Sequence, residues 1–222
     1  MVVKKFCTNL ILTVTLTITF LGSSMTVLAA KKAIIYIPLD NRPVCDEYPK
    51  SVLKAAGYKV YSPPEKLIAT RTTPANSEAL WKWLETKADD CGAAVISTDA
   101  LIYGGLVASR THHFTTEELN RRVTRLKNLN LDTNIKLYAF STLMRTPEQS
   151  FGNVEPEYYS KLGPAIYKYS QLYDKMDENK ASIREGVINK AIERNIDRFP
   201  LQDWLERRDK NMAVNHRLAE LS

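Results

Sequence analysis

The chain has 222 residues, of which 44% are hydrophobic, 25% charged and 9% aromatic, and these values are typical of a globular protein. They exclude a disordered, collagen-like or mucin-like chain, and eight glycines and ten prolines are too few for a low-complexity protein. The net charge of +6 is spread along the chain and gives no indication of nucleic-acid binding, so nucleic acid is not an expected partner.

Residues 1–30 have the order of a secretory signal peptide. Two lysines precede an apolar core from Leu10 to Gly22, and small residues follow it. A membrane anchor is the alternative, but the core of about 13 residues is shorter than the ~20 that cross a bilayer. We therefore expect cleavage after Ala29 or Ala30, which leaves residues 31–222 as a secreted α/β domain without a stable membrane anchor.

Beyond the signal peptide, strand-like and helix-like segments alternate. Short apolar runs predict strands at 33–38, 59–62, 93–98 and 135–141. Apolar residues at helical spacing predict helices over 46–56, 73–87 and 116–129. We expect the second of these helices to be capped by Thr73, with Pro74 at its first position. The repeated strand–helix–strand order predicts an α/β fold with a parallel sheet built from βαβ units, arranged as three layers or a partial barrel.

The last third of the chain predicts a helical segment that follows the sheet. After a loop over 146–156, helices are expected at 157–177, 182–196 and 200–221. The first of them has an aromatic stripe made of Tyr159, Ile166, Tyr169 and Tyr173, which indicates either core packing or a ligand platform.

Cys45 and Cys91 are the cysteines that remain after export. An oxidising compartment permits a disulfide between them, and two buried thiols are the alternative. Because Cys45 follows one predicted strand and Cys91 precedes another, we expect the two residues at opposite ends of the parallel sheet.

Polar residues follow three of the predicted strands, at the ends where parallel α/β sheets bind ligands. They are Asp40, Asn41 and Arg42 after the first strand, Asp99, Tyr103 and Arg110 after the third, and Arg145 after the fourth. Carboxylates accept hydrogen bonds from hydroxyl groups and arginine binds anions, so this set suits a polyol, sugar or phosphate ligand. The alternative is structural: Asp40 caps the next helix and pairs with Arg42, and Asp99 caps a turn.

Other motifs argue against several kinds of site. Gly104-Gly105 is not a phosphate loop, because the chain has neither G-x-x-x-x-G-K-[ST] nor G-x-G-x-x-G, and it lacks the G-x-S-x-G of esterases. His112 and His113 are adjacent without a third ligand at metal spacing, so we predict no metal site. No motif identifies a cofactor.

On the last predicted helix, Arg208, Asn211 and Asn215 share one face. A solvated surface is one interpretation. Because asparagine is a poor helix former, the other interpretation is that this face lines a polar cleft.

Four segments together resemble a bacterial family of exported proteins with a domain of unknown function, DUF4127. They are Y-I-P-L-D-N-R-P from Tyr36, S-T-D-A-L-I-Y-G-G-L-V-A-S-R from Ser97, Y-A-F-S-T-L-M-R from Tyr138 and R-R-D-K-N-M-A-V-N from Arg207. The resemblance covers nearly all of residues 31–222 and implies no particular reaction. In the family pattern a further strand follows the last helix, so the resemblance implies an N-terminal half whose C-terminal half is missing.

These observations lead to two hypotheses of function. As a secreted hydrolase of cell-wall or host carbohydrate, the protein would use Asp40 and Asp99 as a catalytic pair, because glycoside cleavage generally needs two carboxyl groups. The expected substrate-binding residues are Asn41, Arg42, Tyr103, Arg110, Arg145, Asn211 and Asn215. Alternatively, the protein is a non-catalytic surface protein that binds a glycan or a small anionic ligand, or an inactive truncated remnant.

Overall fold

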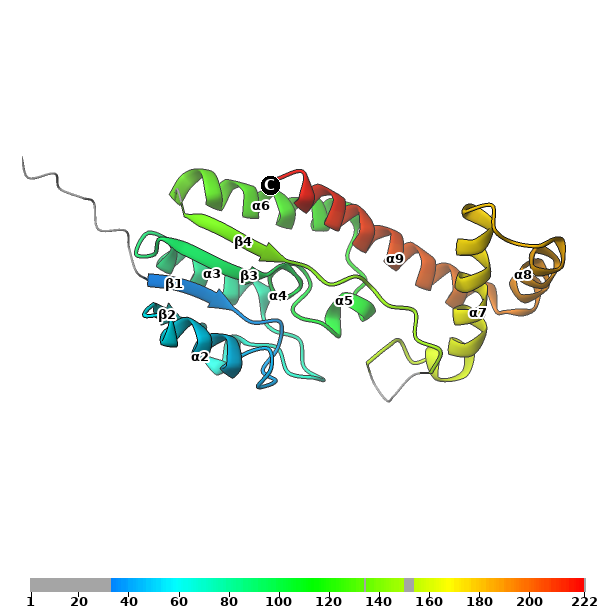
Figure 1. Ribbon diagram of the computed structural model, residues 1–222, viewed down its shortest axis with the longest axis horizontal. Helices are drawn as coiled ribbons and strands as arrows, with labels where there is room; N and C mark the ends of the chain where they lie inside the picture. The colour runs from blue at the N-terminus through cyan, green and yellow to red at the C-terminus, as the bar shows by residue number, and fades with distance from the viewer. Residues whose placement is uncertain (1–32, 134, 150–153, 222) are drawn as a thin grey trace, which may run out of the picture. The chain divides into compact units, whose positions relative to one another are not determined.

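The computed structural model describes residues 33–133, 135–149 and 154–221, so the predicted signal peptide lies outside the described residues. The described strands form one sheet in the order β2 (Lys59–Tyr61), β1 (Ala33–Ile37), β3 (Ala93–Ser97) and β4 (Lys136–Phe140). Each neighbouring pair is parallel (Figure 1). The predicted α/β fold with a parallel sheet is confirmed.

Helices connect the strands and follow the last one. The connecting elements are α2 (Glu47–Ala55), a short 3₁₀ helix η1 (Glu65–Leu67), α3 (Ser77–Ala88), α4 (Thr98–Ile102), α5 (Ala108–Thr111) and α6 (Thr116–Thr133). After β4 come α7 (Tyr159–Asp177), α8 (Ile183–Asn195) and α9 (Arg198–Ala219), which form the predicted helical C-terminal segment.

One face of the sheet carries the main core. Side chains alternate along a strand, so Ile35 and Ile37 of β1 point to the same side as Ala94 and Ile96, their partners on β3. These residues pack against Trp81 of α3 and against other apolar side chains of α3, α4 and α6. Burial of each large side chain stabilises the fold by roughly 1.5–3 kcal/mol, which fixes the register of β1 and β3.

On the opposite face of the sheet, α2 lies beside β1, and side chains of β4 are exposed. The side chain of Tyr36 points to this face, and its hydroxyl donates a hydrogen bond to the carbonyl of Cys45 in the turn that leads into α2. This contact holds α2 on the second face beside β1, although α2 buries none of its own residues. On β4, the same face has Tyr138 and Phe140, which are 59% and 38% exposed.

The C-terminal helices have cores of their own. Tyr159 and Ile166 of α7 pack with Trp204 of α9, and the rings of Tyr159 and Trp204 are 4.4 Å apart at their centroids. Another cluster joins Val214 of α9 to α4, α5 and α6, so α9 touches the sheet domain as well as α7. The aromatic stripe of α7 is core packing at three of its four positions, whereas Tyr173 is 52% exposed.

The structure corrects the start of α3. The helix does not begin at Thr73, because Thr73 accepts a hydrogen bond from Thr70 and belongs to a loop. Asn76 is the cap instead, with its side-chain oxygen accepting the N–H of Ala79 at 3.0 Å. The expected order also omitted α4 and α5, which are too short to show a periodic apolar pattern.

Cys45 and Cys91 lie where the sequence predicted them. Cys91 is buried in the main core just before β3, and Cys45 lies in the loop after β1, so the two residues are at opposite ends of parallel strands.

None of the helices in the described ranges combines the length and hydrophobicity that a membrane span requires.

Candidate functional site

The first polar segment of the site follows β1 and is organised by Asp40. Asp40 is 3% exposed, and its carboxylate accepts two hydrogen bonds from the guanidinium of Arg42, Nε at 2.8 Å and Nη2 at 2.7 Å. The backbone N–H of Arg42 also donates to Asp40 Oδ1. Burial acts to raise the pKa of Asp40, but the hydrogen bonds and charge of Arg42 outweigh it and hold the pKa below its ordinary value. Asp40 therefore stays ionised and fixes Arg42.

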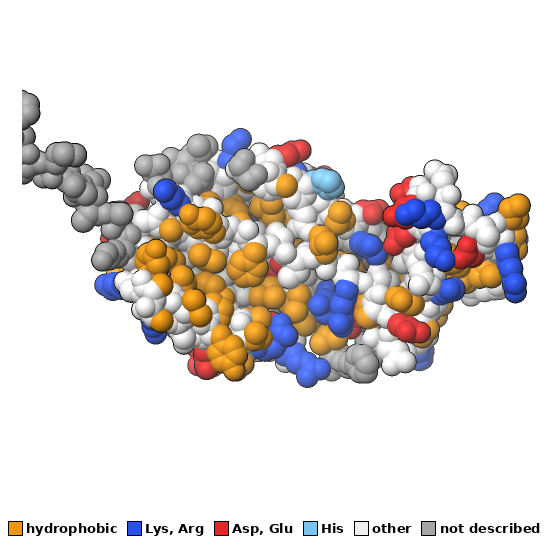
Figure 2. All heavy atoms as spheres, viewed as in Figure 1, with side chains coloured by type: hydrophobic (Ala, Val, Ile, Leu, Met, Phe, Trp, Pro, Cys, Tyr) orange, Lys and Arg blue, Asp and Glu red, His pale blue; other side chains and the backbone are white. Residues whose placement is uncertain are grey.

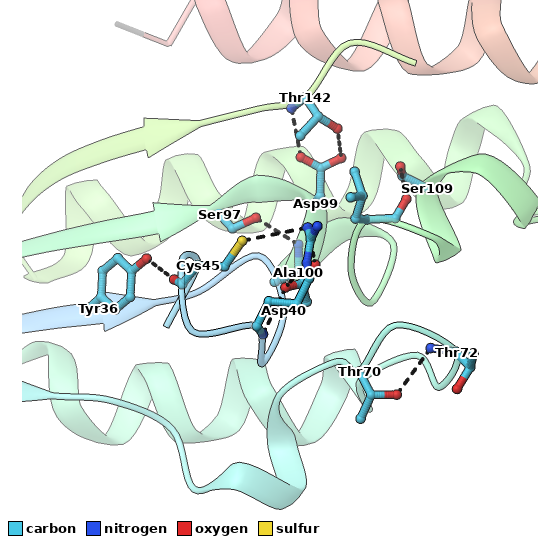
Figure 3. A network of polar contacts seen from close by, with 12 residues as sticks. Tyr36, Asp40, Cys45, Thr70, Thr72, Ser97, Asp99, Ala100, Ser109 and Thr142 are labelled. Carbon is cyan, nitrogen blue, oxygen red and sulfur yellow. Dashed lines mark hydrogen bonds and ion pairs between the residues drawn. The ribbon is translucent and has the colours of Figure 1, made fainter. Parts of the chain in front are cut away.

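Asp99 stands in the first turn of α4, directly after β3. Both of its carboxylate oxygens are held by Thr142, which donates its N–H to one and its hydroxyl to the other, each at 2.9 Å (Figure 3). Asp99 is 2% exposed, and this burial raises its pKa against the opposing effect of the Thr142 hydrogen bonds. The carboxyl group thus ties the end of β3 to the end of β4.

Glu155 organises the third polar segment. Its Oε1 accepts hydrogen bonds from Arg145, Nη2 at 2.8 Å and Nε at 3.2 Å, and Arg110 Nη1 lies 3.4 Å from the same oxygen. The side chain of Glu155 has no exposed surface, while that of Arg145 is 47% exposed and that of Arg110 is 11% exposed. One buried carboxylate therefore holds two arginines that come from different elements.

The three segments converge on Arg110. Burial lowers the pKa of Arg110, the charges of Arg145 and Arg42 lower it further, and the carboxylates of Glu155 and Asp99 act in the opposite direction. Charges act on one another in this way only at short range in salt solution. The structure thus brings together the charged residues that the sequence placed at three separate strand ends.

Cys45 also belongs to the segment after β1. Its thiol lies 3.7 Å from Nη2 of Arg42, and burial raises the pKa of this thiol. The thiol is therefore largely protonated at neutral pH and is not an activated nucleophile.

The turn at Gly104 and Gly105 determines how closely the loop that follows β2 approaches the strand ends. Gly104 and Gly105 have φ angles of 94° and 121°, and their N–H groups donate to the backbone carbonyl of Asp99 at 3.1 and 2.9 Å. A Cβ on Gly105 would stand 2.5 Å from the Cβ of Ala69, so this position admits only glycine without rearrangement. The turn allows the loop that follows β2 to pack against the strand ends.

The asparagines of α9 make backbone contacts. Asn215 Nδ2 donates to the carbonyl of Thr142 at 3.2 Å, and Asn211 Nδ2 donates to the carbonyl of Ser109 at 2.8 Å. The face of α9 that carries them therefore lies against the strand-end loops and not in solvent. Asn211 is 5% exposed, so its observed role is to anchor α9.

His112 and Tyr103 form a buried group beside Asn211. His112 Nε2 lies 2.9 Å from Asn211 Oδ1, and the ring of His112 stacks on Tyr103 with a centroid distance of 4.9 Å. The hydroxyl of Tyr103 is buried and has no hydrogen-bond partner among the described residues. Tyr103 thus faces the interior in this structure.

A groove lies next to the strand ends and not directly over them. It has a volume of about 940 Å³ and runs along β4 between α6 and the end of α9, with mostly apolar walls. Ser141 and Asn215 line one part of it, so the groove borders the polar segment that contains Thr142.

Sequence reasoning missed the residues that hold the predicted ones in place. Thr142 is one of them, and the sequence marks it only as a polar residue near the end of a predicted strand. Glu155 had no such signal, since it is an isolated acid in a loop. Asn41 is exposed, and its backbone N–H donates a hydrogen bond to the carbonyl of Ala69.

Within the described ranges, no three His, Cys, Asp or Glu side chains are grouped so that they could hold a metal ion. The carboxylates of the site are instead occupied by arginine and threonine donors.

The sequence was also compared with known proteins. A family model described as "Protein of unknown function (DUF4127)" matches residues 34–222, which is most of the chain. The search of curated proteins and the search of solved structures gave no match.

Proposed function

The chain belongs to the DUF4127 family, and from that premise we propose that it is a secreted protein that binds a small anionic ligand, such as an acidic sugar, at the ends of its strands. One observation carries the proposal: the side chains that the site presents to solvent are cationic. Arg42 and Arg145 are 46% and 47% exposed, whereas the carboxylates that hold them, Asp40 and Glu155, are 4% and 0% exposed.

The arginines are fixed before a ligand arrives. Arg42 uses Nε and Nη2 for Asp40, and Arg145 uses the same two atoms for Glu155. Each guanidinium has further N–H donors at Nη1, which suit a carboxylate or phosphate. Because the ion pairs already restrict both side chains, binding an anion costs less conformational entropy than it would with mobile arginines.

Hydroxyl groups of the strand-end loops favour a sugar over a bare anion. The Thr98 hydroxyl lies 2.7 Å from that of Ser141, and Arg208 donates to the hydroxyl of Thr146 at 2.6 Å. Ser141 also lines the adjoining groove. A uronic acid combines one carboxylate for an arginine with hydroxyls for such groups.

Calorimetric titration of the purified protein with glucuronate, sulfate and glucose tests the proposal. Glucuronate is expected to bind, sulfate to bind more weakly, and glucose not to bind. Arg145→Gln should weaken glucuronate binding roughly tenfold or more, the value of a lost charge-assisted hydrogen bond. Arg121→Gln, an exposed arginine of α6, is the matched control and should leave binding unchanged. Equal losses in both variants, or no binding of either anion, would refute the proposal.

Carbohydrate hydrolysis is the second candidate, and one observation favours it. The pKa of Asp40 is held below its ordinary value while that of Asp99 is raised. In enzymes that need one ionised and one protonated carboxyl group, different environments separate the pKa values of the two groups in this way. Asp99 would then be the proton donor and Asp40 the ionised partner, although both must become accessible, since each is at most 3% exposed.

Release of reducing ends from uronate-containing and neutral glycans tests hydrolysis. Asp99→Asn keeps an oxygen for the Thr142 N–H and gains a donor for its hydroxyl, so the variant should fold. If the enzyme hypothesis holds, Asp40→Asn and Asp99→Asn abolish turnover without a large change in the thermal transition. No turnover by the unmodified chain rejects hydrolysis and leaves the binding proposal standing.

A further inference from the structure

The second face of the sheet is exposed over β3 and β4. Strand pairing places Val95 opposite Tyr138, and Ser97 opposite Phe140, on the side away from the main core. Tyr138 is 59% exposed and Phe140 38% exposed. Among the described helices α2 lies on this side beside β1 and β2, which leaves β3 and β4 open (Figure 1). Parallel sheets normally have both faces covered.

Helix α2, which lies on this side of the sheet, carries a row of exposed apolar side chains. Val44, Tyr48 and Val52 are spaced four residues apart, so they form one stripe along the helix and the turn that precedes it. They are 62%, 63% and 68% exposed. Figure 2 shows many apolar side chains gathered over this side of the sheet and α2. We name the stripe of α2 the ridge, and Tyr138 with Phe140 and Val95 the floor.

We propose that this face joins two copies of the chain, with the ridge of each copy packed on the floor of the other. The dimensions of the two parts match. The floor is two strands wide, about 10 Å at the usual strand spacing, which is the diameter of one helix. The nine residues of α2 span about 13 Å and the five residues of β4 about 16 Å, so one helix covers the floor along its length.

The arrangement of ridge and floor favours a second copy as the occupant. The two lie side by side on one face, so the face is complementary to itself under a two-fold rotation, as a symmetric dimer requires. A rotation axis parallel to the strands, above the boundary between β1 and β3, places each ridge over the other copy's floor. Both contacts then form at once, and the previously exposed sheet face is covered on both copies.

The exposed area corresponds to a weak dimer. With about 150–250 Å² for each fully exposed side chain of this size, the five exposed residues of ridge and floor present roughly 550 Å² per copy. That is at the upper end of the largest apolar patch on a typical monomer. Two such faces bury about 1,100 Å², just below the range of stable interfaces, so the dimer is expected to dissociate on dilution.

Sedimentation equilibrium of the protein as its host produces it, over a range of concentrations, tests the proposal. The unmodified chain should show a monomer–dimer equilibrium. Val52→Glu on the ridge and Tyr138→Lys on the floor should each raise the dissociation constant at least about tenfold, since a charge would be buried at an apolar contact. Val187→Glu on α8 is the matched control, because this valine is 64% exposed but outside the face, and it should leave the equilibrium unchanged.

A mixing experiment distinguishes ridge-to-floor packing from any other contact. When Val52→Glu and Tyr138→Lys chains are mixed, one contact of the mixed dimer joins the new glutamate to the new lysine and the other is unmodified. The mixed pair should therefore associate more tightly than either variant alone. A chain that is monomeric at every concentration overturns the proposal, and so does a Val187→Glu effect equal to the others. The proposal is also overturned if the mixed variants associate no more tightly than either variant alone.

Discussion

Acid should destabilise this protein through one buried histidine. His112 is 8% exposed, and its Nδ1 accepts the N–H of Phe114 at 3.2 Å. Its Nε2 must then carry the proton and donate to Asn211 Oδ1, whose amide nitrogen is directed at the carbonyl of Ser109. Adding a second proton would place a buried charge on the ring and remove the acceptor for Phe114. Burial accordingly lowers the pKa of His112 to about 4, and the charge of Arg207 acts in the same direction.

The size of the effect follows from the two pKa values. Between pH 6.5 and pH 4 the unfolded chain binds a proton at His112 and the folded chain does not. The free energy of unfolding therefore falls as the pH falls through this window, and this contribution levels off below it. The difference between the ordinary pKa of 6.5 and a pKa of about 4 corresponds to roughly 3 kcal/mol.

Urea unfolding at a series of pH values between 7.5 and 4 measures this loss. His112→Gln cannot titrate but can still donate to Asn211, so the variant should be about 1–2 kcal/mol less stable at pH 7.5. It should then lose roughly 3 kcal/mol less than the unmodified chain on acidification. His216→Gln, at an exposed position of α9, is the matched control for replacing a histidine with glutamine. If the acid loss is the same in His112→Gln as in the unmodified chain, the buried neutral imidazole is not its source.

Three further outcomes are expected. Glu155→Gln leaves Arg110 and Arg145 without their shared carboxylate, so urea unfolding should show a free energy of unfolding lower by about 2–4 kcal/mol, and salt should reduce this loss. Glu178→Gln, which removes an exposed pair with Lys180, should lower it by less than about 0.5 kcal/mol. Gly105→Ala should lower the thermal midpoint strongly, while Gly186→Ala, with open space around it in α8, should not lower it. The intact mass of the secreted product should match a chain whose first residue is Ala30 or Lys31. A full-length chain retained in the membrane would contradict export.

The sheet was predictable because its strands are continuous apolar runs with clear turn signals. Ala33–Ile37 and Ala93–Ser97 end within one residue of their predicted bounds, since both are buried on the core face and stop at polar residues. The start of α3 was not predictable, because it depends on a long-range contact. The carbonyl of Gly104 accepts a hydrogen bond from the N–H of Ala75 and keeps the preceding residues in a loop. Such a contact has no local sequence pattern.

The candidate site was predictable in its members but not in their pairings. The rule that ligands bind beyond parallel strand ends selects Asp40, Asp99 and Arg145 without any structure. It does not reveal that Asp99 is held by Thr142 or that Arg145 shares Glu155 with another arginine. Those pairings depend on how loops from distant parts of the chain meet, and the sequence encodes them only through the whole fold.

Hydrogen exchange at the backbone amide of Thr142 can report the opening of this site. Its N–H is bound by Asp99, and its carbonyl is bound by Asn215 of α9. Exchange of this one amide hydrogen with deuterium requires the Asp99 contact to open, and opening is easier when α9 has moved away. The exchange rate at Thr142 therefore measures how often the contact between the ends of β3 and β4 opens, in the unmodified protein and without any probe attached.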